Sequence, residues 1–339
     1  MKSLIIPIFI PNQGCPHRCI FCEQQSITSQ SCQTINSAHV ERVLDKAIRS
    51  KDFDLGRKPE VAFYGGTFTR LPLYRMSELL GAVAPYLKQG FFLSIRVSTR
   101  PDALDEKRLK IMEDYGVLTV ELGAQSMDDK VLVLSKRGHT AEDTVRAVET
   151  LRAHGLRVGI QLMPGLPGDS GERFRSTITE VIKLSPDLVR LYPAVVIRGT
   201  EMARLYREGR YEPLGLEEAV EICAESCVRL ERQGIPVIRI GLMSSPSLLE
   251  KGRILAGPWH TAFGFLVRSN IQHQNIQNDL PDWGVVSQIK IRVSKKEVPL
   301  VRGYKNQGLQ LLKRKTGAKV IRIEPDDSIP PGRIRVERI

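Results

Sequence analysis

The stretch Cys15-Pro16-His17-Arg18-Cys19-Ile20-Phe21-Cys22 decides how the rest of the chain is interpreted. Its three thiols follow the spacing C-x3-C-x2-C, close behind an apolar, strand-like run from Leu4 to Pro11. Thiolates are the soft ligands that iron–sulfur clusters and zinc select. A closed structural site has four protein ligands, whereas a reactive site keeps a coordination position open. The three thiols therefore indicate a metal cluster with one open position. A zinc site is the alternative, with Cys32 as the fourth ligand at an unusual spacing.

Strand-like and helix-like segments alternate after this loop. Short apolar runs predict strands at 60–64, 91–98, 117–123, 157–163, 188–192 and 236–241, and helical periodicity predicts helices at 37–50, 73–87, 103–115, 172–184 and 216–233. Ser37 and Asp102 are the expected N-caps of two of these helices. Alternating strands and helices form βαβ units around a parallel sheet. Roughly six such units fit before residue 245, so we expect an α/β fold of the partial (β/α)6 TIM-like barrel type, with its site at the carboxyl ends of the strands.

Length and composition are those of an ordinary globular protein. The chain has 339 residues, of which 42% are hydrophobic and 26% charged, enough for one large domain and a small one. The apolar run near the amino end is too short to span a bilayer, contains Pro7, and lacks the cleavage site of a signal peptide. Six cysteines, three of them clustered, suit metal ligation in a reducing compartment better than a disulfide framework. We expect a cytoplasmic protein without membrane segments.

The basic character of the chain is concentrated in its tail. Residues 285–339 contain fourteen Lys or Arg and five Asp or Glu, a net charge of +9, so the first 284 residues carry only +3 of the total of +12. We therefore expect a barrel domain over 1–245, a connecting segment over 246–284 and a small basic α/β domain over 285–339. Its strand–helix–strand pattern resembles a KH module, whose GXXG loop clamps the backbone of single-stranded nucleic acid. The matching loop is Gly303-Tyr304-Lys305-Asn306, with Asn in place of the second Gly. A basic cap that binds nothing is the alternative.

The cysteine spacing resembles the cluster loop of the radical S-adenosylmethionine (SAM) enzymes, and Phe21 occupies their aromatic position before the last cysteine. The resemblance implies that Cys15, Cys19 and Cys22 hold a [4Fe-4S] cluster whose fourth iron binds SAM, with Phe21 beside the cofactor. It also implies reductive cleavage of SAM to a 5′-deoxyadenosyl radical that abstracts hydrogen from a substrate. An electron donor such as flavodoxin or ferredoxin is the implied redox partner.

Three loops after predicted strands extend this resemblance. The pair Gly65-Gly66 permits close backbone approach to a ligand, although a Gly-Gly turn is often only a turn. The loops Glu121–Ser126, Lys136–Thr140 and Gln161–Gly168 resemble the oxygen-independent coproporphyrinogen oxidase branch, except that Gln161 stands where an acid usually meets the ribose. The resemblance implies SAM contacts from Gly65, Gly66, Thr67, Gln125, Arg137, Gln161 and Met163. Tyr192, at the end of a predicted strand, is the expected catalytic residue on the substrate side.

A more specific likeness comes from three ordered stretches: Ser98-Thr99-Arg100-Pro101-Asp102, Arg137-Gly138-His139-Thr140, and Leu191-Tyr192-Pro193 with Ile197-Arg198-Gly199-Thr200. They resemble the radical SAM half of the Elongator catalytic subunit (Elp3), and the likeness extends over about residues 5–245. It implies an RNA substrate, tRNA first, bound with the help of residues 285–339. The acetyltransferase part of that enzyme has no recognisable counterpart here, so acetyl transfer is not expected. The alternatives are a small-molecule radical SAM enzyme of the coproporphyrinogen oxidase type and a non-catalytic iron–sulfur RNA-binding protein.

Two further cysteines have a simpler explanation. Cys223 and Cys227 lie four residues apart, on the same stripe as Leu216, Val220 and Leu230 of a predicted amphipathic helix. A buried cysteine behaves as a small hydrophobic residue. We therefore expect both thiols in the core rather than in a second metal site.

Overall fold

A parallel sheet organises the larger part of the chain in the computed structural model, which describes residues 4–29, 35–277 and 279–338. Within these residues the sheet has seven strands in the order β1-β2-β3-β4-β5-β6-β8, and each neighbouring pair is parallel. The strands are β1 (Ile5–Phe9), β2 (Glu60–Tyr64), β3 (Ile95–Thr99), β4 (Val117–Gln125), β5 (Arg157–Leu162), β6 (Leu188–Leu191) and β8 (Val237–Ile240). Because every neighbouring pair is parallel, the carboxyl ends of all seven strands lie at the same edge of the sheet. The predicted partial TIM-like barrel is confirmed.

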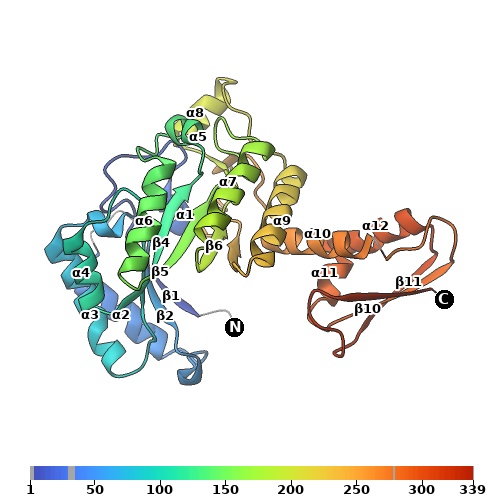
Figure 1. Ribbon diagram of the computed structural model, residues 1–339, viewed down its shortest axis with the longest axis horizontal. Coiled ribbons are helices and arrows are strands. Elements are labelled where there is room, and N and C mark those ends of the chain that lie inside the picture. Colours follow the sequence, from blue (N-terminus) through green and yellow to red (C-terminus); the bar gives the residue numbers. More distant parts are fainter. Residues whose placement is uncertain (1–3, 30–34, 278, 339) are drawn as a thin grey trace. The chain divides into compact units, whose positions relative to one another are not determined.

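Helices cover the outer face of this sheet, as α6 and α7 do in front of β4 to β6 in Figure 1. Between residues 24 and 232 the longer helices are α2 (Ser37–Ile48), α3 (Leu73–Lys88), α4 (Glu106–Asp114), α6 (Ala141–Ala153), α7 (Gly171–Leu184) and α9 (Leu216–Arg232), and the shorter ones are α1 (Gln24–Thr28), α5 (Asp129–Leu134) and α8 (Glu201–Arg207). A small antiparallel pair joins β7 (Val196–Ile197) to β9 (Ile254–Ala256). Successive residues Val61, Ala62 and Phe63 are all fully buried. A parallel strand covered on both faces has this pattern.

Two helix starts differ from the prediction. Asp102 does not cap α4, because both of its carboxylate oxygens accept hydrogen bonds from Arg100, at 2.8 and 3.0 Å. Asp105 caps the helix instead. At the start of α2 the cap is Asn36, one residue before the predicted Ser37, and its side chain accepts from the backbone amide of residue 39 at 3.0 Å.

Strand β3 also starts later than predicted, at Ile95 instead of residue 91. The ring of Phe92 packs against those of Phe53 and Tyr86, with centroids 5.8 and 6.2 Å apart, and Leu93 is exposed. These contacts fix the segment before Ile95 outside the sheet, a tertiary effect that an apolar run in the sequence does not reveal.

The chain divides into two compact units. We call Met1–Gly215 with Arg229–Trp259 the barrel unit, and Leu216–Val228 with His260–Ile339 the C-terminal unit. The expected connecting segment at 246–284 therefore has residues in both units, up to Trp259 in the first and from His260 in the second.

The C-terminal unit has its own small sheet and core. It contains α10 (Phe263–Gln277), β10 (Gln288–Val293), α11 (Val298–Arg302), α12 (Gln307–Thr316), β11 (Val320–Pro325) and β12 (Ile334–Arg338). The sheet order is β11-β10-β12, with β10 parallel to β11 and antiparallel to β12. Ile289, Ile291 and Val293 of β10 are buried together with Val301 and Leu312 of the helices. The small α/β architecture expected for this region is present.

Two expectations about other segments can be compared with the structure. Cys223 and Cys227 are fully buried, as expected for core residues. Cys32 lies outside the described residues. Among the helices of the described residues, none is both long and apolar enough to cross a membrane.

Candidate active site

The cysteine loop leaves β1 and lies directly against the loop that follows β2. The amide of Thr67 donates to the carbonyl of Gln13 at 2.9 Å. A Cβ on Gly14, whose φ is +73°, would lie 2.2 Å from the carbonyl oxygen of Thr67, and one on Gly66 would lie 2.3 Å from that of Gln13. Real Cβ atoms do not approach backbone this closely, so only glycine fits at both positions. The sequence indicated that Gly66 belongs to the site because it follows a predicted strand, whereas it did not single out Gly14.

The three thiols of this loop are half-buried, and each contacts a different polar group. Cys15 Sγ lies 3.4 Å from Thr67 Oγ1, and Cys22 Sγ lies 3.9 Å from Asn12 Oδ1. Cys19 Sγ accepts a hydrogen bond of 2.9 Å from Arg137 Nη1. Burial and the neighbouring thiols raise the pKa of Cys22 to about 12, against the opposing effect of the Arg137 charge. The isolated loop thus disfavours several thiolates side by side, and a bound cation would remove that cost.

One cavity at the carboxyl ends of the strands collects most of the predicted site residues. Of these it is lined by Cys15, Cys19, Phe21, Cys22, Gly65, Gly66, Thr67, Gln125, Arg137 and Gln161. It is also lined by residues that we had not predicted for the site: Asn12, His17, Gln24, Ser98, Thr99, Arg100, Glu121 and Gly123. Ser98, Thr99 and Arg100 were noticed in the sequence only as part of a resemblance. The cavity therefore gathers residues from the carboxyl ends of β2, β3, β4 and β5 and from the segment between α5 and α6 around the cysteines.

Met163 and Tyr192 are not among the residues that line this cavity. The Met163 side chain packs against the apolar cluster that contains Ile20 and Val131, and its amide donates to the Gln125 carbonyl at 2.8 Å. The Tyr192 hydroxyl accepts from Arg190 Nη1 at 3.0 Å. The predicted roles of Met163 and Tyr192 at the site therefore stay predictions.

At the carboxyl end of β4, hydrogen bonds from side chains replace part of the regular backbone pairing with β5. Its pairing with β5 is irregular between Leu122 and Gln125, and Gln125 has a φ of +70°. Arg137 Nη2 donates to the Gly123 carbonyl at 2.5 Å, and His139 Nε2 lies 3.2 Å from the Ala124 carbonyl. Burial, and then the charge of Arg137, lowers the pKa of His139 to about 4. His139 is therefore neutral and donates its Nε2 proton. The bulge turns Gln125 into the cavity, where its Oε1 accepts from Gln161 Nε2 at 3.2 Å.

A buried ionic network is centred on Glu121, which also lines the cavity, and was missed by sequence reasoning. The carboxylate of Glu121 accepts from Arg96 at 2.7 Å, forms an ion pair with Arg190 Nε at 2.7 Å, and accepts from the Tyr64 hydroxyl at 2.9 Å. Arg96 also pairs with Glu60. Burial and then the Glu121 charge raise the pKa of Tyr64 above its usual range, so the phenol stays protonated. The network links β2, β3, β4 and β6. A charged residue inside an apolar strand is the sequence feature that could have identified it.

Comparison with known proteins identifies the family. The sequence matches the radical SAM superfamily over residues 9–181 and the radical SAM C-terminal domain over residues 186–273. The chain belongs to the radical SAM superfamily. Members of this superfamily are enzymes that use a [4Fe-4S] cluster and SAM, which confirms the cofactors and the enzyme class expected from the cysteine spacing.

Curated relatives support the Elongator-like branch. The chain is 30% identical over 255 residues to the tRNA uridine(34) acetyltransferase of Methanocaldococcus jannaschii, covering 64% of this chain and 47% of the relative. It is 31% identical over 273 residues to that of Dehalococcoides mccartyi, covering 69% and 60%. The coproporphyrinogen-III oxidase-like protein HemZ of Bacillus subtilis is 24% identical over 239 residues, covering 68% and 46%. The chain thus spans less than two thirds of the length of each of these three relatives.

Solved structures show the same fold. The archaeal Methanocaldococcus infernus Elp3 with an N-terminal deletion superposes with a TM-score of 0.62 at 23% identity, covering 82% of this chain and 65% of that chain. Methylornithine synthase (PylB) superposes with a TM-score of 0.50 at 15% identity, covering 78% and 86%. At these identities the likeness concerns the fold alone.

The thiols and polar groups that line the cavity are of the types that bind a [4Fe-4S] cluster and SAM. Three thiols face it from one loop, and the buried guanidinium of Arg137 offsets negative charge beside Cys19. In the described residues, no three His, Cys, Asp or Glu side chains converge closely enough to bind one metal ion. A four-iron cluster does not need such convergence, because each thiolate binds a different iron. Amide, hydroxyl and glycine backbone groups beside the thiols match the polar groups of SAM.

Proposed function

We propose that this chain is a radical SAM enzyme that acts on RNA, with tRNA as the substrate class. The observation that carries the proposal is the likeness to two relatives named tRNA uridine(34) acetyltransferase, over 255 and 273 residues. These spans extend well beyond a superfamily motif. The matched stretches cover 47% and 60% of those proteins, so the proposal concerns the substrate class and the radical chemistry, not acetyl transfer.

In this proposal the cysteine loop holds the cluster. Cys15, Cys19 and Cys22 would each bind one iron, with Phe21 packed beside them. When bound, the reduced cluster would supply the single electron that splits SAM into methionine and a 5′-deoxyadenosyl radical. The protein's own contribution is to bind and orient both cofactors and to exclude water from the cavity. The backbone contacts of the neighbouring loops, which leave no space for a Cβ at Gly66, support a rigid loop suited to this task.

The polar residues of the cavity would hold SAM. The backbone at Gly65 and Gly66 and the hydroxyl of Thr67 suit the methionyl amino group, and the amide pair of Gln125 and Gln161 suits the ribose hydroxyls. Arg137 is buried and ends at the cavity wall, with Cys19 Sγ and the Gly123 carbonyl as hydrogen-bond acceptors. A planar guanidinium can bind a carboxylate through two parallel hydrogen bonds, so Arg137 is our candidate for the SAM carboxylate.

The C-terminal unit would bind RNA through its helices. On its sheet, Lys290 and Arg292 are paired with acidic side chains, namely Glu324, Asp326 and Glu337. On the helical side, the Gly303-Tyr304-Lys305-Asn306 loop joins α11 to α12 and has positive φ at Gly303, Lys305 and Asn306. Gly303 and Asn306 thus have the left-handed backbone that such a turn requires. Arg302 and Lys305 at this loop take part in no ion pair that the described residues contain, which leaves both cations available for phosphates.

A small-molecule substrate is the second candidate. The observation in its favour is the 24% identity to the coproporphyrinogen-III oxidase-like protein HemZ over 239 residues. In that case the basic unit would not bind nucleic acid, and RNA would not affect turnover.

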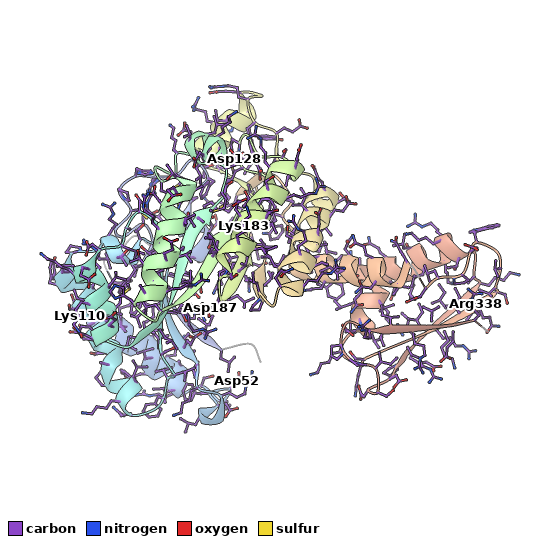
Figure 2. All side chains as sticks on the ribbon, in the orientation of Figure 1. Asp52, Lys110, Asp128, Lys183, Asp187 and Arg338 are labelled. Carbon is purple, nitrogen blue, oxygen red and sulfur yellow. The ribbon has the colours of Figure 1, made fainter. Side chains whose placement is uncertain are left out.

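Binding and turnover of tRNA by the full-length chain test the proposal. We expect saturable tRNA binding that weakens steeply with salt, and faster 5′-deoxyadenosine formation in the presence of the cognate tRNA. Arg302→Glu and Lys305→Glu should weaken binding and lower the salt slope, whereas Lys110→Glu, at an exposed position of α4 (Figure 2), should not. Weak, salt-insensitive binding that is the same in all of these proteins would contradict an RNA substrate.

A further inference from the structure

Trp283 of the C-terminal unit is an exposed aromatic residue without a core around it. Its relative exposure is 73%, among the highest of the large hydrophobic side chains in the described residues. The backbone that carries it is nevertheless anchored, because the amide of Gly284 donates to the Thr316 carbonyl at 2.9 Å. Most tryptophans bury the ring and find a partner for the indole N–H. Trp283 instead presents most of its ring to solvent from a fixed position.

The indole of Trp283 lies close to the backbone of Gly317. A Cβ at Gly317 would lie 3.2 Å from both Cε2 and Nε1 of Trp283, closer than side chains normally approach. Gly317 has a φ of +70° and ends α12 as its C-cap. The absent side chain lets the edge of the indole lie against backbone and leaves the rest of the ring open. The geometry is that of a small platform at the carboxyl end of α12.

Four cations lie within four residues of Gly317 along the chain. Lys313, Arg314 and Lys315 form the last turn of α12, Lys319 follows two residues after Gly317, and all four are exposed. None of them takes part in an ion pair within the parts of the chain that the structure describes. They outweigh the carboxylate of the neighbouring Asp282. A helix C-terminus by itself disfavours anions, and three cations in the last turn offset that effect.

We propose that Trp283 and these cations form a binding site for single-stranded RNA, in which the indole stacks on one unpaired base. Lys313, Lys315 and Lys319 bind the flanking phosphates. This inference rests on the proposed RNA substrate and adds a contact to it. Aromatic platforms bordered by cations bind single strands without sequence preference, since every base has a flat face. The positive surroundings favour this partner over an apolar protein surface.

This site is separate from the loop at 303–306. Helix α12 has ten residues, so its two ends lie about 15 Å apart, with the loop at the amino end and Trp283 at the carboxyl end. A strand that reaches both ends would follow α12. Each contact can therefore be tested alone.

The test uses the full chain and a fluorescein-labelled oligouridine, followed by anisotropy. Trp283→Leu should weaken binding by about 5- to 150-fold, the range for loss of one stacked base, and Trp283→Phe should retain most of the affinity. In a Trp259→Phe background Trp283 is the remaining tryptophan, and its emission should be quenched by the oligonucleotide in a saturable way. Inorganic polyphosphate, which has charge but no bases, should bind equally well to Trp283→Leu and to the wild type. Thermal unfolding checks that each variant is folded.

The outcomes separate this inference from the proposed function. Normal oligouridine binding by Trp283→Leu would overturn the stacking site and leave the RNA substrate intact. An equal loss of polyphosphate binding in that variant would also overturn it, because the effect would then concern charge. If wild-type protein binds neither oligouridine nor tRNA, the RNA substrate fails and the stacking site fails with it.

Discussion

Replacing Glu121 with Gln tests the role of the buried network centred on this residue. The side chains of Glu121, Arg96 and Glu60 are at most 4% exposed, and that of Arg190 is 12% exposed. The two glutamates balance the two arginines. Glu121→Gln keeps the shape of the side chain but removes one charge, so two buried guanidinium groups then face Glu60 alone. The new amide also turns N–H donors toward groups that are themselves donors.

The expected loss of stability is large. Removing one partner of a buried ion pair costs about 3–5 kcal/mol, because the remaining charge is left without compensation. For a unit of this size, 1 kcal/mol lowers the Tm by about 2–4 °C, so Glu121→Gln should lower it by about 6–20 °C. The matched control is Asp114→Asn, which breaks the exposed ion pair with Lys110 on α4, a residue at the outer surface in Figure 2. That pair should contribute less than about 1 kcal/mol.

Circular dichroism during heating of the cluster-free proteins measures both effects. The barrel unit should unfold earlier in Glu121→Gln, while Asp114→Asn should unfold within about 4 °C of the wild type. A Tm of Glu121→Gln no lower than that of Asp114→Asn would refute the reasoning that this network holds the strands together.

Substitutions of Gly66, His139 and Arg137 have specific expected outcomes. Gly66→Ala should prevent cluster assembly, because a Cβ would lie 2.3 Å from the Gln13 carbonyl oxygen; wild-type iron content after anaerobic reconstitution would contradict this. His139 has a folded-state pKa of about 4 against an ordinary 6.5, so between these values the unfolded chain binds a proton that the folded chain does not, and stability falls as pH falls. His139→Gln should remove up to about 3 kcal/mol of that acid sensitivity, measured as the change in unfolding free energy between pH 7 and pH 4; an unchanged pH dependence would argue against it. Arg137→Lys should weaken SAM binding about tenfold or more in equilibrium dialysis, because an ammonium group cannot bind a carboxylate through two parallel bonds. An unaltered Kd would exclude Arg137 as the carboxylate ligand.

Local patterns were sufficient to predict the architecture and the centre of the site. The cysteine spacing and the glycines after β2 are continuous in sequence, and the cavity brings them together as expected. Alternation of short apolar runs with helices predicted the parallel sheet. Helix boundaries were less predictable, since two good capping residues compete and tertiary contacts decide. Asp105, not Asp102, caps α4, because Arg100 donates hydrogen bonds to both carboxylate oxygens of Asp102.

Features that depend on register across several strands were not predictable. Glu121, Arg96 and Arg190 lie on β4, β3 and β6, and nothing in the local sequence pairs them. Tyr192 was expected on the substrate side because it ends a strand, but it does not line this cavity and its hydroxyl accepts a hydrogen bond from Arg190. Met163 likewise turns into an apolar cluster. Which side chains at a strand end reach the cavity depends on tertiary packing, which a single sequence does not encode locally.

Reductive cleavage of SAM is the most direct test of the account. The protein is reconstituted anaerobically with iron and sulfide, reduced with dithionite, supplied with SAM, and assayed for 5′-deoxyadenosine. We expect 5′-deoxyadenosine from the wild type and none from Cys19→Ala. A wild-type protein with a full four-iron cluster that forms no 5′-deoxyadenosine, or one that binds zinc in place of the cluster, would contradict the central claim.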